Sequence, residues 1–336
     1  LLEGETEDAF LVYQFQKRSS KVLHYYFDNK IDPNLKTLFE EATKAWEDYS
    51  CIDFVEDRNT KSEICVEGQK YEDCLHRGTP GGNQWLTVGC GYFTGVAHEV
   101  GHALGLEHTH SRPDRDQYLT VDWNNVEKEF RALYEKEIQR DSQSLIDVYN
   151  KTFRRQFEKI SGNTNYSGIL YDYGSIMHYG ASGTNPSMIP KDRNHKRTIG
   201  SQAISFADLL EVNKRHNCEE KCLSDERAVQ CEYQGFPNPK NCSACVCPSG
   251  YGGRSCGDKP GECGQHVIAS DDWQTLEESI QSPKNTSRYV TCTSWIRVEV
   301  ENNPTEASFK EENRLVGLYR CDVTVNDPQK GSVVHM

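Results

Sequence analysis

The apolar residues in the N-terminal part of the chain predict a strand followed by a helix. Val22–Phe27 is rich in β-branched and aromatic residues, which predicts a strand. After the capping pair Asp32-Pro33, apolar residues recur at helical spacing. They are Leu35, Leu38, Phe39, Ala42, Ala45, Trp46 and Tyr49. This stripe predicts a helix with one face packed on a sheet. Residues 51–55 and 83–88 are further predicted strands, and the second is expected at the sheet edge, where an extended peptide could add as another strand.

Charged residues dominate positions 127–159, yet apolar residues keep a roughly helical period there. We predict one or two amphipathic helices, and a solvated charged face is favoured over a dedicated partner site. Further along, Ser205 and Asp208 have the spacing of a capping box, so a helix is expected to start there and to end near His216. From Cys263 to Met336, β-rich runs alternate with polar turns.

The composition is typical of a secreted protein with more than one domain. The chain has 336 residues, enough for a full catalytic domain and something smaller, and its 14 cysteines favour disulfides formed outside the cytosol. Its net charge of -13, without a basic stripe, argues against nucleic acid or an anionic membrane as a partner. No apolar run has transmembrane length. No signal peptide opens the chain, so a secreted protein would begin here after its targeting segment.

A helix is predicted to start at about Phe93, and the stretch 96–108 contains residues that point to a metal site. His98 and His102 are four residues apart, so on a helix both imidazoles project from one face and can share a metal ion. Glu99 lies beside them. Gly105 is able to adopt a left-handed conformation, which would redirect the chain and bring His108 back to the metal. Three neutral imidazoles are the ligands of a catalytic zinc site.

The chemistry of zinc assigns a role to the glutamate. Three protein ligands would leave one position for water, whose pKa zinc lowers to about 7. Glu99 would take a proton from this water during attack on a peptide carbonyl and return it to the leaving amine, as a general base and acid. The competing interpretation is a pair of core histidines on an amphipathic helix, and the extended motif with its third histidine makes it far less favoured.

A second motif lies downstream. Residues 175–179, Ser-Ile-Met-His-Tyr, have the sequence of the methionine turn that metzincins place beneath the zinc. Together with His108–Asp116, this turn resembles the astacin family of zinc endopeptidases, and the resemblance covers about residues 21 to 218. Most family members have Glu after the third histidine, where this chain has Thr109. That Glu normally anchors the mature N-terminus in the family, so this anchoring is in question here.

The resemblance implies both a site and a fold. The zinc ligands would be His98, His102, His108 and Tyr179, with Glu99 as the base and Met177 as support beneath the metal. Tyr179 would leave the metal during the reaction to stabilise the oxyanion. The implied fold is α+β: a two-subdomain metzincin catalytic domain with a mixed sheet, and with the zinc helix at the floor of the cleft between an upper sheet subdomain and a lower, mostly irregular one.

Disulfides follow from the same kind of resemblance. In the catalytic domain they are Cys51–Cys218 and Cys65–Cys90, which leaves Cys74 without an obvious partner. Six cysteines then fall within the Gly/Pro-rich stretch 222–256, which resembles an EGF-like module. The implied pairs are Cys222–Cys242, Cys231–Cys245 and Cys247–Cys256. A zinc ribbon is the competing interpretation, but clustered thiols are oxidised in a secreted chain.

The remaining segments complete the predicted organisation. Residues 1–20 are predicted to be a pro-segment remnant or an N-terminal strand, 21–218 the astacin-like protease domain and 219–257 the EGF-like module. Residues 258–336 are predicted to be a β-rich, CUB-like segment that is either divergent or truncated. In the last segment Cys263 would pair with Cys292, which leaves Cys321 without a partner. Glycosylation sequons begin at Asn150, Asn165, Asn241 and Asn285.

The sequence therefore predicts a secreted zinc-dependent endopeptidase, made as a zymogen, that binds one Zn²⁺ per chain and hydrolyses protein or peptide substrates. The module order and Thr109 look most like nematode members of the family. Four basic residues after the methionine turn would be a subsite for acidic side chains or an exposed basic loop, and they are Lys191, Arg193, Lys196 and Arg197. The alternative function is an extracellular binding protein that acts through its EGF-like and CUB-like modules and uses the protease domain as a scaffold.

Overall fold

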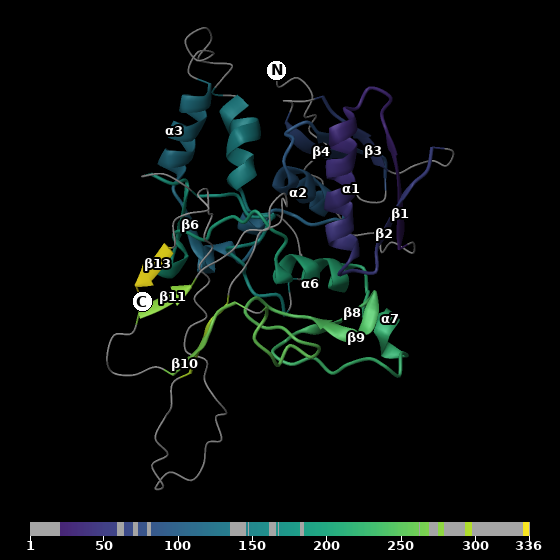
Figure 1. The fold of residues 1–336 in the computed structure, drawn as a ribbon. Helices are drawn as coiled ribbons and strands as arrows, with labels where there is room; N and C mark the ends of the chain where they lie inside the picture. The colour runs from purple at the N-terminus through teal and green to yellow at the C-terminus, as the bar shows by residue number, and fades with distance from the viewer. Residues whose placement is uncertain are drawn as a thin grey trace. The chain divides into compact units, whose positions relative to one another are not determined.

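Two compact units make up the chain, Leu1–Lys221 and Cys222–Met336. The structure is a computed structural model (Figure 1). It describes residues 21–58, 64–69, 73–78, 82–134, 146, 148–160, 166, 168–181, 185–261, 263–268, 275–278, 293–297 and 332–335. The predicted N-terminal segment 1–20 lies outside the described residues.

A five-stranded mixed sheet forms the first half of unit 1. Its strands are β1 (Val22–Phe27), β2 (Asp53–Glu56), β3 (Ile64–Glu67), β4 (Cys74–Gly78) and β5 (Gln84–Val88). Their spatial order is β2-β1-β3-β5-β4, and every neighbouring pair is parallel except β4 and β5. The sheet is therefore mixed, as predicted, with its one antiparallel strand at the β4 end.

The prediction that residues 83–88 form the edge strand is wrong. β5 pairs with β3 on one side and with β4 on the other, so the edge strand is β4. Gly78, the last residue of β4, lies opposite Gln84, the first residue of β5. Gly78 has φ +101°, and a Cβ there would lie 2.3 Å from the carbonyl oxygen of Asn83, so this end of β4 requires glycine. This hairpin folds β4 back along the outer side of β5.

Helix α1 (Pro33–Glu47) packs on the sheet through the predicted apolar stripe. The Asp32 side chain caps its N-terminus by accepting a hydrogen bond from Asn34 N at 2.8 Å. Phe39 and Trp46 are fully buried, and burial of each side chain contributes about 1.5–3 kcal/mol. Tyr49, which the stripe included, lies beyond the end of the helix and is exposed.

Helix α2 (Phe93–Ala103) starts at the predicted residue and packs against α1. Trp46 Nε1 donates a hydrogen bond to the carbonyl of Ala97 in α2 at 3.0 Å. Because Trp46 is buried, this bond satisfies its only polar atom and fixes the two helices against each other. The sheet and α1 thus form a rigid support for α2.

The second half of unit 1 is less regular. Its short elements are η2 (Thr109–Ser111), η3 (Arg115–Gln117), β6 (Leu119–Val121), α3 (Trp123–Leu133), η4 (Tyr149–Phe153), η5 (Arg154–Phe157), β7 (Met188–Pro190), η6 (Arg193–His195) and α6 (Phe206–Arg215). β6 and β7 pair antiparallel. The capping box at Ser205 and Asp208 is confirmed, and α6 ends at its C-cap His216, as predicted. A buried cluster of Leu119, Val126, Phe157, Tyr171, Tyr173, Met188 and Ile199 forms the core here.

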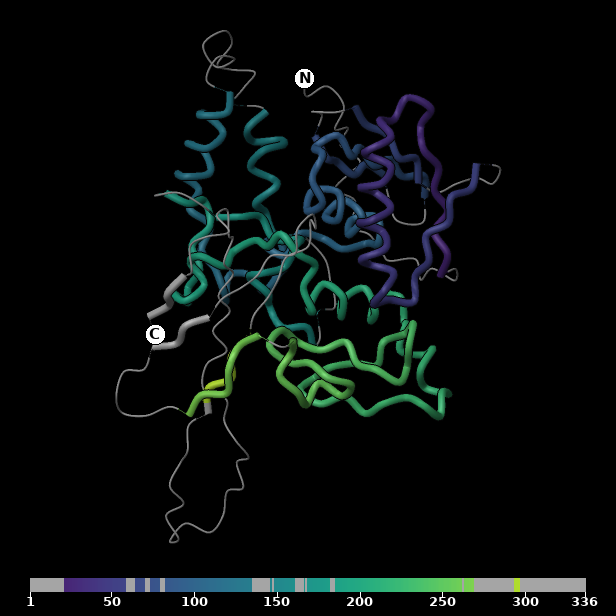
Figure 2. The backbone as a smooth tube through the Cα atoms, in the orientation of Figure 1, coloured from purple at the N-terminus to yellow at the C-terminus, as the bar shows by residue number. Residues whose placement is uncertain are grey.

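Two helical segments within the predicted amphipathic stretch run side by side (Figure 2). One is α3, which begins at Trp123, and the other comprises the π-helical turn η4 and the 3-10 turn η5. Phe130 of α3 contacts Tyr149 and Phe153, with ring centroids 5.2 and 5.4 Å apart. Apolar residues that recur with a helical period in the sequence therefore form the contact between these two segments.

The disulfides of unit 1 correct one predicted pair. Cys51 bonds to Cys218, the pair that the family resemblance implied, whereas Cys90 bonds to Cys74 and not to Cys65. Cys74 starts the edge strand β4 opposite Val88, so it lies close to the residues that follow β5. Cys65 is a buried free thiol on β3, between β1 and β5 in the middle of the sheet. In the register of the sheet Cys65 lies opposite Trp85, five residues before Cys90, whereas Cys74 lies opposite Val88.

The described residues of unit 2 form three disulfides with one another, Cys222–Cys242, Cys231–Cys245 and Cys247–Cys256, and these are the pairs that the EGF-like resemblance implied. A hairpin of β8 (Phe236–Asn238) and β9 (Asn241–Val246) lies among them, after the short helix α7 (Glu220–Leu223). Two further strand pairs follow: β10 (His266–Ile268) with β12 (Trp295–Arg297), and β11 (Thr275–Glu278) with β13 (Ser332–His335).

Several predicted features of the tail and of the sequons lie beyond what is described. Cys263 is disulfide-bonded, whereas Cys292 and Cys321 lie outside the described residues. Asn150 and Asn241 are exposed, as glycosylation would require, and Asn165 and Asn285 lie outside the described residues.

Candidate active site

The C-terminus of α2 has the geometry that the three-histidine motif requires. Leu106 N donates to Gly101 O at 3.0 Å and Gly105 N donates to His102 O at 2.9 Å, which together form a Schellman motif. Gly105 has φ +94°, so the predicted left-handed turn is confirmed. The chain therefore leaves the helix axis after His102, and His108 returns toward the face that carries the first two histidines.

The three imidazoles converge on one point. The Nε2 atoms of His98, His102 and His108 form a triangle with every side 3.1 Å long. His98 Nδ1 donates to Ile176 O and His102 Nδ1 donates to Leu106 O, each at 2.8 Å. A neutral imidazole has one N–H, so the Nε2 atoms of these two rings carry lone pairs directed at each other. Such an arrangement requires a cation between them.

Zinc fits this set of donors. At the usual Zn–N distance of about 2.0–2.1 Å, tetrahedral ligand atoms are about 3.3 Å apart, close to the observed 3.1 Å. Burial lowers the pKa of His98, and it lowers the pKa of His102 and His108 well below the usual value. The three rings are thus held neutral, which is the form that binds metal. Among the described residues, these three form the one cluster of histidine, cysteine or acidic side chains with this convergence.

Glu99 is buried on the same helix, with 8% of its surface exposed. Burial raises the pKa of its carboxyl group to about 7, while a hydrogen bond from the backbone N–H of His76 acts in the opposite direction. His76 belongs to β4, and its Nε2 lies 2.8 Å from Gln84 Oε1. The edge strand thus contacts the carboxylate directly, a link that the sequence did not reveal.

The methionine turn lies against α2 at a glycine. A Cβ on Gly101 would lie 2.6 Å from Met177 Sδ, so the close approach of the turn depends on the missing side chain. Met177 is 1% exposed, and its carbonyl accepts a hydrogen bond from Thr109 N at 3.0 Å. Met177 therefore packs against the zinc helix and also contacts the residue after the third histidine.

Tyr179 lies beside the third histidine. Its ring centroid is 4.5 Å from that of His108 and 4.3 Å from that of His110. His110 is fully buried, and its Nε2 donates to the carbonyl of Gln156 at 2.9 Å, which leaves Nδ1 to accept from Tyr179 N at 3.4 Å. His110 was not a predicted site residue, yet it connects Tyr179 to the segment 149–157.

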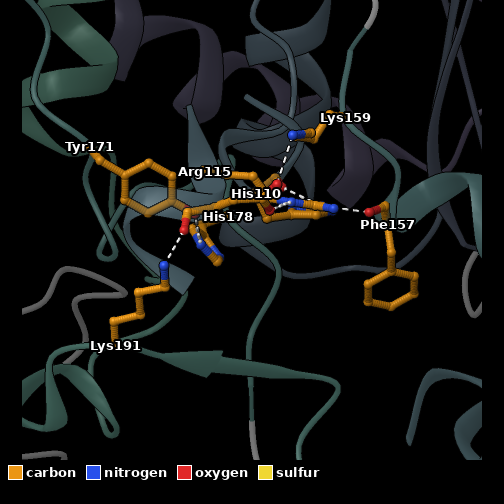
Figure 3. Close-up of polar contacts among 8 residues, drawn as sticks. His110, Arg115, Phe157, Lys159, Tyr171, His178 and Lys191 are labelled. Carbon is orange, nitrogen blue, oxygen red and sulfur yellow. Dashed lines mark hydrogen bonds and ion pairs between the residues drawn. The ribbon is translucent and has the colours of Figure 1, made fainter. Parts of the chain in front are cut away.

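Polar contacts extend this arrangement behind His110 (Figure 3). Arg115 Nη1 donates to the carbonyls of His110 and Phe157, and His178 Nε2 lies 2.8 Å from the hydroxyl of Tyr171. Arg115 and His178 belong to the family motifs and Phe157 to the apolar period of residues 127–159, but none of the three was predicted as a site residue. Arg115 thus connects the backbone of His110 to that of Phe157, and Tyr171 holds the ring of His178, the residue before Tyr179.

A cleft of about 1230 Å³ contains the candidate site, and its lining includes Glu99, the three histidines and Tyr179. Residues 73–76, from the start of β4, line the cleft, as do Lys151, Thr152, Arg155 and Gln156 of η4 and η5. The charged face predicted to be solvated therefore borders the cleft in part. None of the four basic residues at 191–197 is among the described residues of the cleft lining, so the lining does not support the interpretation of these residues as a substrate subsite over that of an exposed basic loop.

The three convergent imidazoles at one helix, the glycine turn and the buried methionine define a metzincin-type zinc site. The model of the peptidase family Astacin matches residues 11–153 and 146–217. The chain belongs to the astacin family.

Named relatives support this assignment. The zinc metalloproteinase nas-31 of Caenorhabditis elegans is 35% identical over 283 residues, which cover 82% of this chain and 42% of the relative. The zinc metalloproteinase nas-26 of the same organism is 33% identical over 255 residues, 73% of this chain and 58% of the relative. The chain thus spans about half the length of these relatives.

A solved structure is similar to part of the chain. It is the High choriolytic enzyme 1, a hatching enzyme zinc-protease from Oryzias latipes, at 27% identity and a TM-score of 0.47. The match covers 60% of this chain and 94% of that chain.

Among the helices that the structure describes, none has both the length and the apolar character of a membrane span.

Proposed function

We propose that this protein is a zinc-dependent endopeptidase whose reaction takes place in the cleft above α2. The observation that carries the proposal is the triangle of three Nε2 atoms, 3.1 Å on each side, next to the buried carboxylate of Glu99. A structural pair of core histidines would not direct lone pairs at one another. The set of donors is that of a catalytic zinc site.

The proposed roles follow from where each group lies. Zinc held by His98, His102 and His108 would supply Lewis-acid chemistry and an acidified water as nucleophile. Glu99 takes the proton from the attacking water and transfers it to the leaving amine, since its carboxylate lines the same cleft. Tyr179 lies against His108, and by family resemblance its hydroxyl would be a further ligand of the metal and would donate a hydrogen bond to the oxyanion in the transition state.

Protein or peptide substrates fit the edge strand β4. Its first residues line the cleft, and β5 is its sheet partner among the described strands, so its outer edge offers backbone groups to an extended peptide. Such a peptide would pass the zinc site while held in a regular conformation. This supports an endopeptidase, which needs a binding site on both sides of the scissile bond.

The remaining organisation is part of the same proposal. The five disulfides between described cysteines support folding in an oxidising compartment and thus secretion. The pairing in unit 2 supports an EGF-like module at 219–257, ahead of a CUB-like segment at 258–336, and both are candidate sites for protein partners. Residues 1–20 would be the remnant of a pro-segment. A binding protein with an inactive protease scaffold is not favoured, because the three histidines and Glu99 are all in place.

Metal content and cleavage, measured on the same preparation, test the proposal. We expect about one zinc per chain and hydrolysis of internal bonds in unstructured peptides, lost on treatment with a strong chelator and restored by zinc. The variant His102→Ala removes one donor and should lose both zinc and activity. Peptide cleavage that persists at full rate in a metal-free preparation would contradict the proposal.

A further inference from the structure

A chain of hydroxyl groups runs from the residue after the third histidine to the start of α6. Thr109 Oγ1 donates to Ser175 Oγ at 2.8 Å, and Ser175 Oγ donates to Asp208 Oδ1 at 2.5 Å. We call Thr109, Ser175 and Asp208 the hydroxyl relay. The carboxylate at its end only accepts, which fixes the direction of both hydrogen bonds.

The end of the relay is fully satisfied. Asp208 is 4% exposed, and its Oδ2 accepts from Ile176 N and from Ser205 N, each at 2.9 Å. Ser175 Oγ also accepts from Met177 N at 2.9 Å. One buried carboxylate therefore caps α6 and holds the methionine turn, and the relay connects both to Thr109. Satisfied buried networks of this kind make a local structure rigid.

His108 differs from the other two histidines in how it is held. His98 and His102 each donate from Nδ1 to a backbone carbonyl, whereas no described residue accepts a hydrogen bond from His108 Nδ1. The contacts of the His108 ring are with the Nε2 atoms of the other two histidines and with neighbouring rings. The backbone carbonyl of His108 accepts a hydrogen bond from Ser111 N at 2.9 Å. The contacts that connect this segment to the methionine turn belong to the next residue, Thr109, whose N–H and hydroxyl donate to Met177 O and Ser175 Oγ.

We propose that the hydroxyl relay positions His108, so that Thr109 orients the third metal ligand through its side chain. This inference rests on the proposed zinc site and names residues that do not touch the metal. Without the Thr109 hydroxyl, one of the two hydrogen bonds that hold residue 109 to the turn is lost, and the preceding imidazole gains freedom. Residues that orient metal ligands in this way typically contribute about 10-fold to 100-fold to metal affinity.

Substitutions of nearly constant shape separate positioning from folding. Thr109→Val keeps the branched shape and removes the hydroxyl, whereas Thr109→Ser keeps the hydroxyl. Thr43→Val is a control for the loss of a threonine hydroxyl, because the hydroxyl of Thr43 likewise donates a hydrogen bond, to the backbone carbonyl of Glu40 in α1, away from the cleft. Ser175→Ala removes the next member of the relay and serves as a second probe if Thr109→Val folds poorly.

The readouts are zinc affinity, measured on the full chain by competition with a chromophoric chelator, and the visible spectrum of the Co²⁺-substituted protein. We expect Thr109→Val and Ser175→Ala each to weaken zinc binding about 10-fold and to shift the Co²⁺ bands. The double variant Thr109→Val/Ser175→Ala should bind zinc with the same affinity as whichever single variant binds it less tightly, because both changes interrupt one relay. Thr109→Ser and Thr43→Val should match the parent protein.

Two results would overturn the inference: parent-like zinc affinity and Co²⁺ spectrum in Thr109→Val, or losses in the two single variants that simply add. If Thr109→Val lowered the melting temperature but left metal binding unchanged, the inference would also be wrong, because the relay would then contribute only to stability. Failure of the parent protein to bind zinc or to cleave peptides would instead contradict the proposed function, so the two failures are distinguishable.

Discussion

The disulfide Cys74–Cys90 closes a loop with a sequence separation of 16 residues, and its removal should have a measurable cost. In the chain-entropy model, a loop of this size stabilises the folded state by about 3 kcal/mol. For a domain of about 200 residues, 1 kcal/mol shifts the melting temperature by about 2–4 °C, so the expected loss is about 6–12 °C. The double variant Cys74→Ala/Cys90→Ala removes both sulfurs and leaves no unpaired partner.

The assay is thermal unfolding of the full chain, monitored by calorimetry and by the rate of peptide cleavage measured at increasing temperatures. Cys65→Ala is the matched control, since Cys65 is a buried free thiol and its loss opens no loop. We expect a smaller shift in this variant. Non-reducing peptide mapping of the parent protein should recover Cys74 linked to Cys90. A peptide that joins Cys65 to Cys90, or an unchanged melting temperature in the double variant, would refute the reasoning.

Four further predictions concern the cleft. Glu99→Gln should keep zinc, measured by metal analysis, and lower kcat at least about 100-fold, because it keeps the shape and loses the base; a parent-like kcat would contradict the role of Glu99. Tyr179→Phe should lower kcat on the order of 100-fold with little change in KM, the scale of one oxyanion donor, and a kcat equal to the parent would leave it a packing residue. Gly105→Ala places a Cβ at φ +94° and should lower stability by about 1–2 kcal/mol and weaken zinc binding, as calorimetry and metal competition would show; an unchanged melting temperature would argue against a strained turn. Lys151→Ala/Arg155→Ala should raise KM about fivefold for peptides with acidic side chains near the scissile bond, compared with neutral peptides, and equal effects on both kinds would exclude a charge effect.

Local patterns predicted the zinc helix and its surroundings well. The start of α2, the left-handed Gly105 and the capping box of α6 each depend on a few adjacent residues, so their sequence determines them. The three cysteine pairs of unit 2 could be predicted only through the EGF-like resemblance, because six cysteines by themselves allow 15 pairings.

Strand order was harder to predict, because pairing depends on contacts between distant residues. The sequence of residues 83–88 does not indicate which strands pair with it on either side, and the strand β4 (Cys74–Gly78) was not predicted. The wrong partner for Cys90 is related to this error, since the position of Cys74 at the sheet edge became clear only from the hairpin. Likewise, the charged residues of 127–159 gave no indication that Lys151 and Arg155 line the cleft.

The bond between Cys51 and Cys218 has a consequence for how the protein survives in the presence of proteases, its own copies included. It joins positions with a sequence separation of 167 residues, and the three histidines, Glu99 and Tyr179 all lie between them. A single cut anywhere in that interval would yield two polypeptides that stay covalently linked. Such a nicked enzyme would migrate as one species on a non-reducing gel and as two after reduction, with every candidate catalytic residue still tethered to the same molecule.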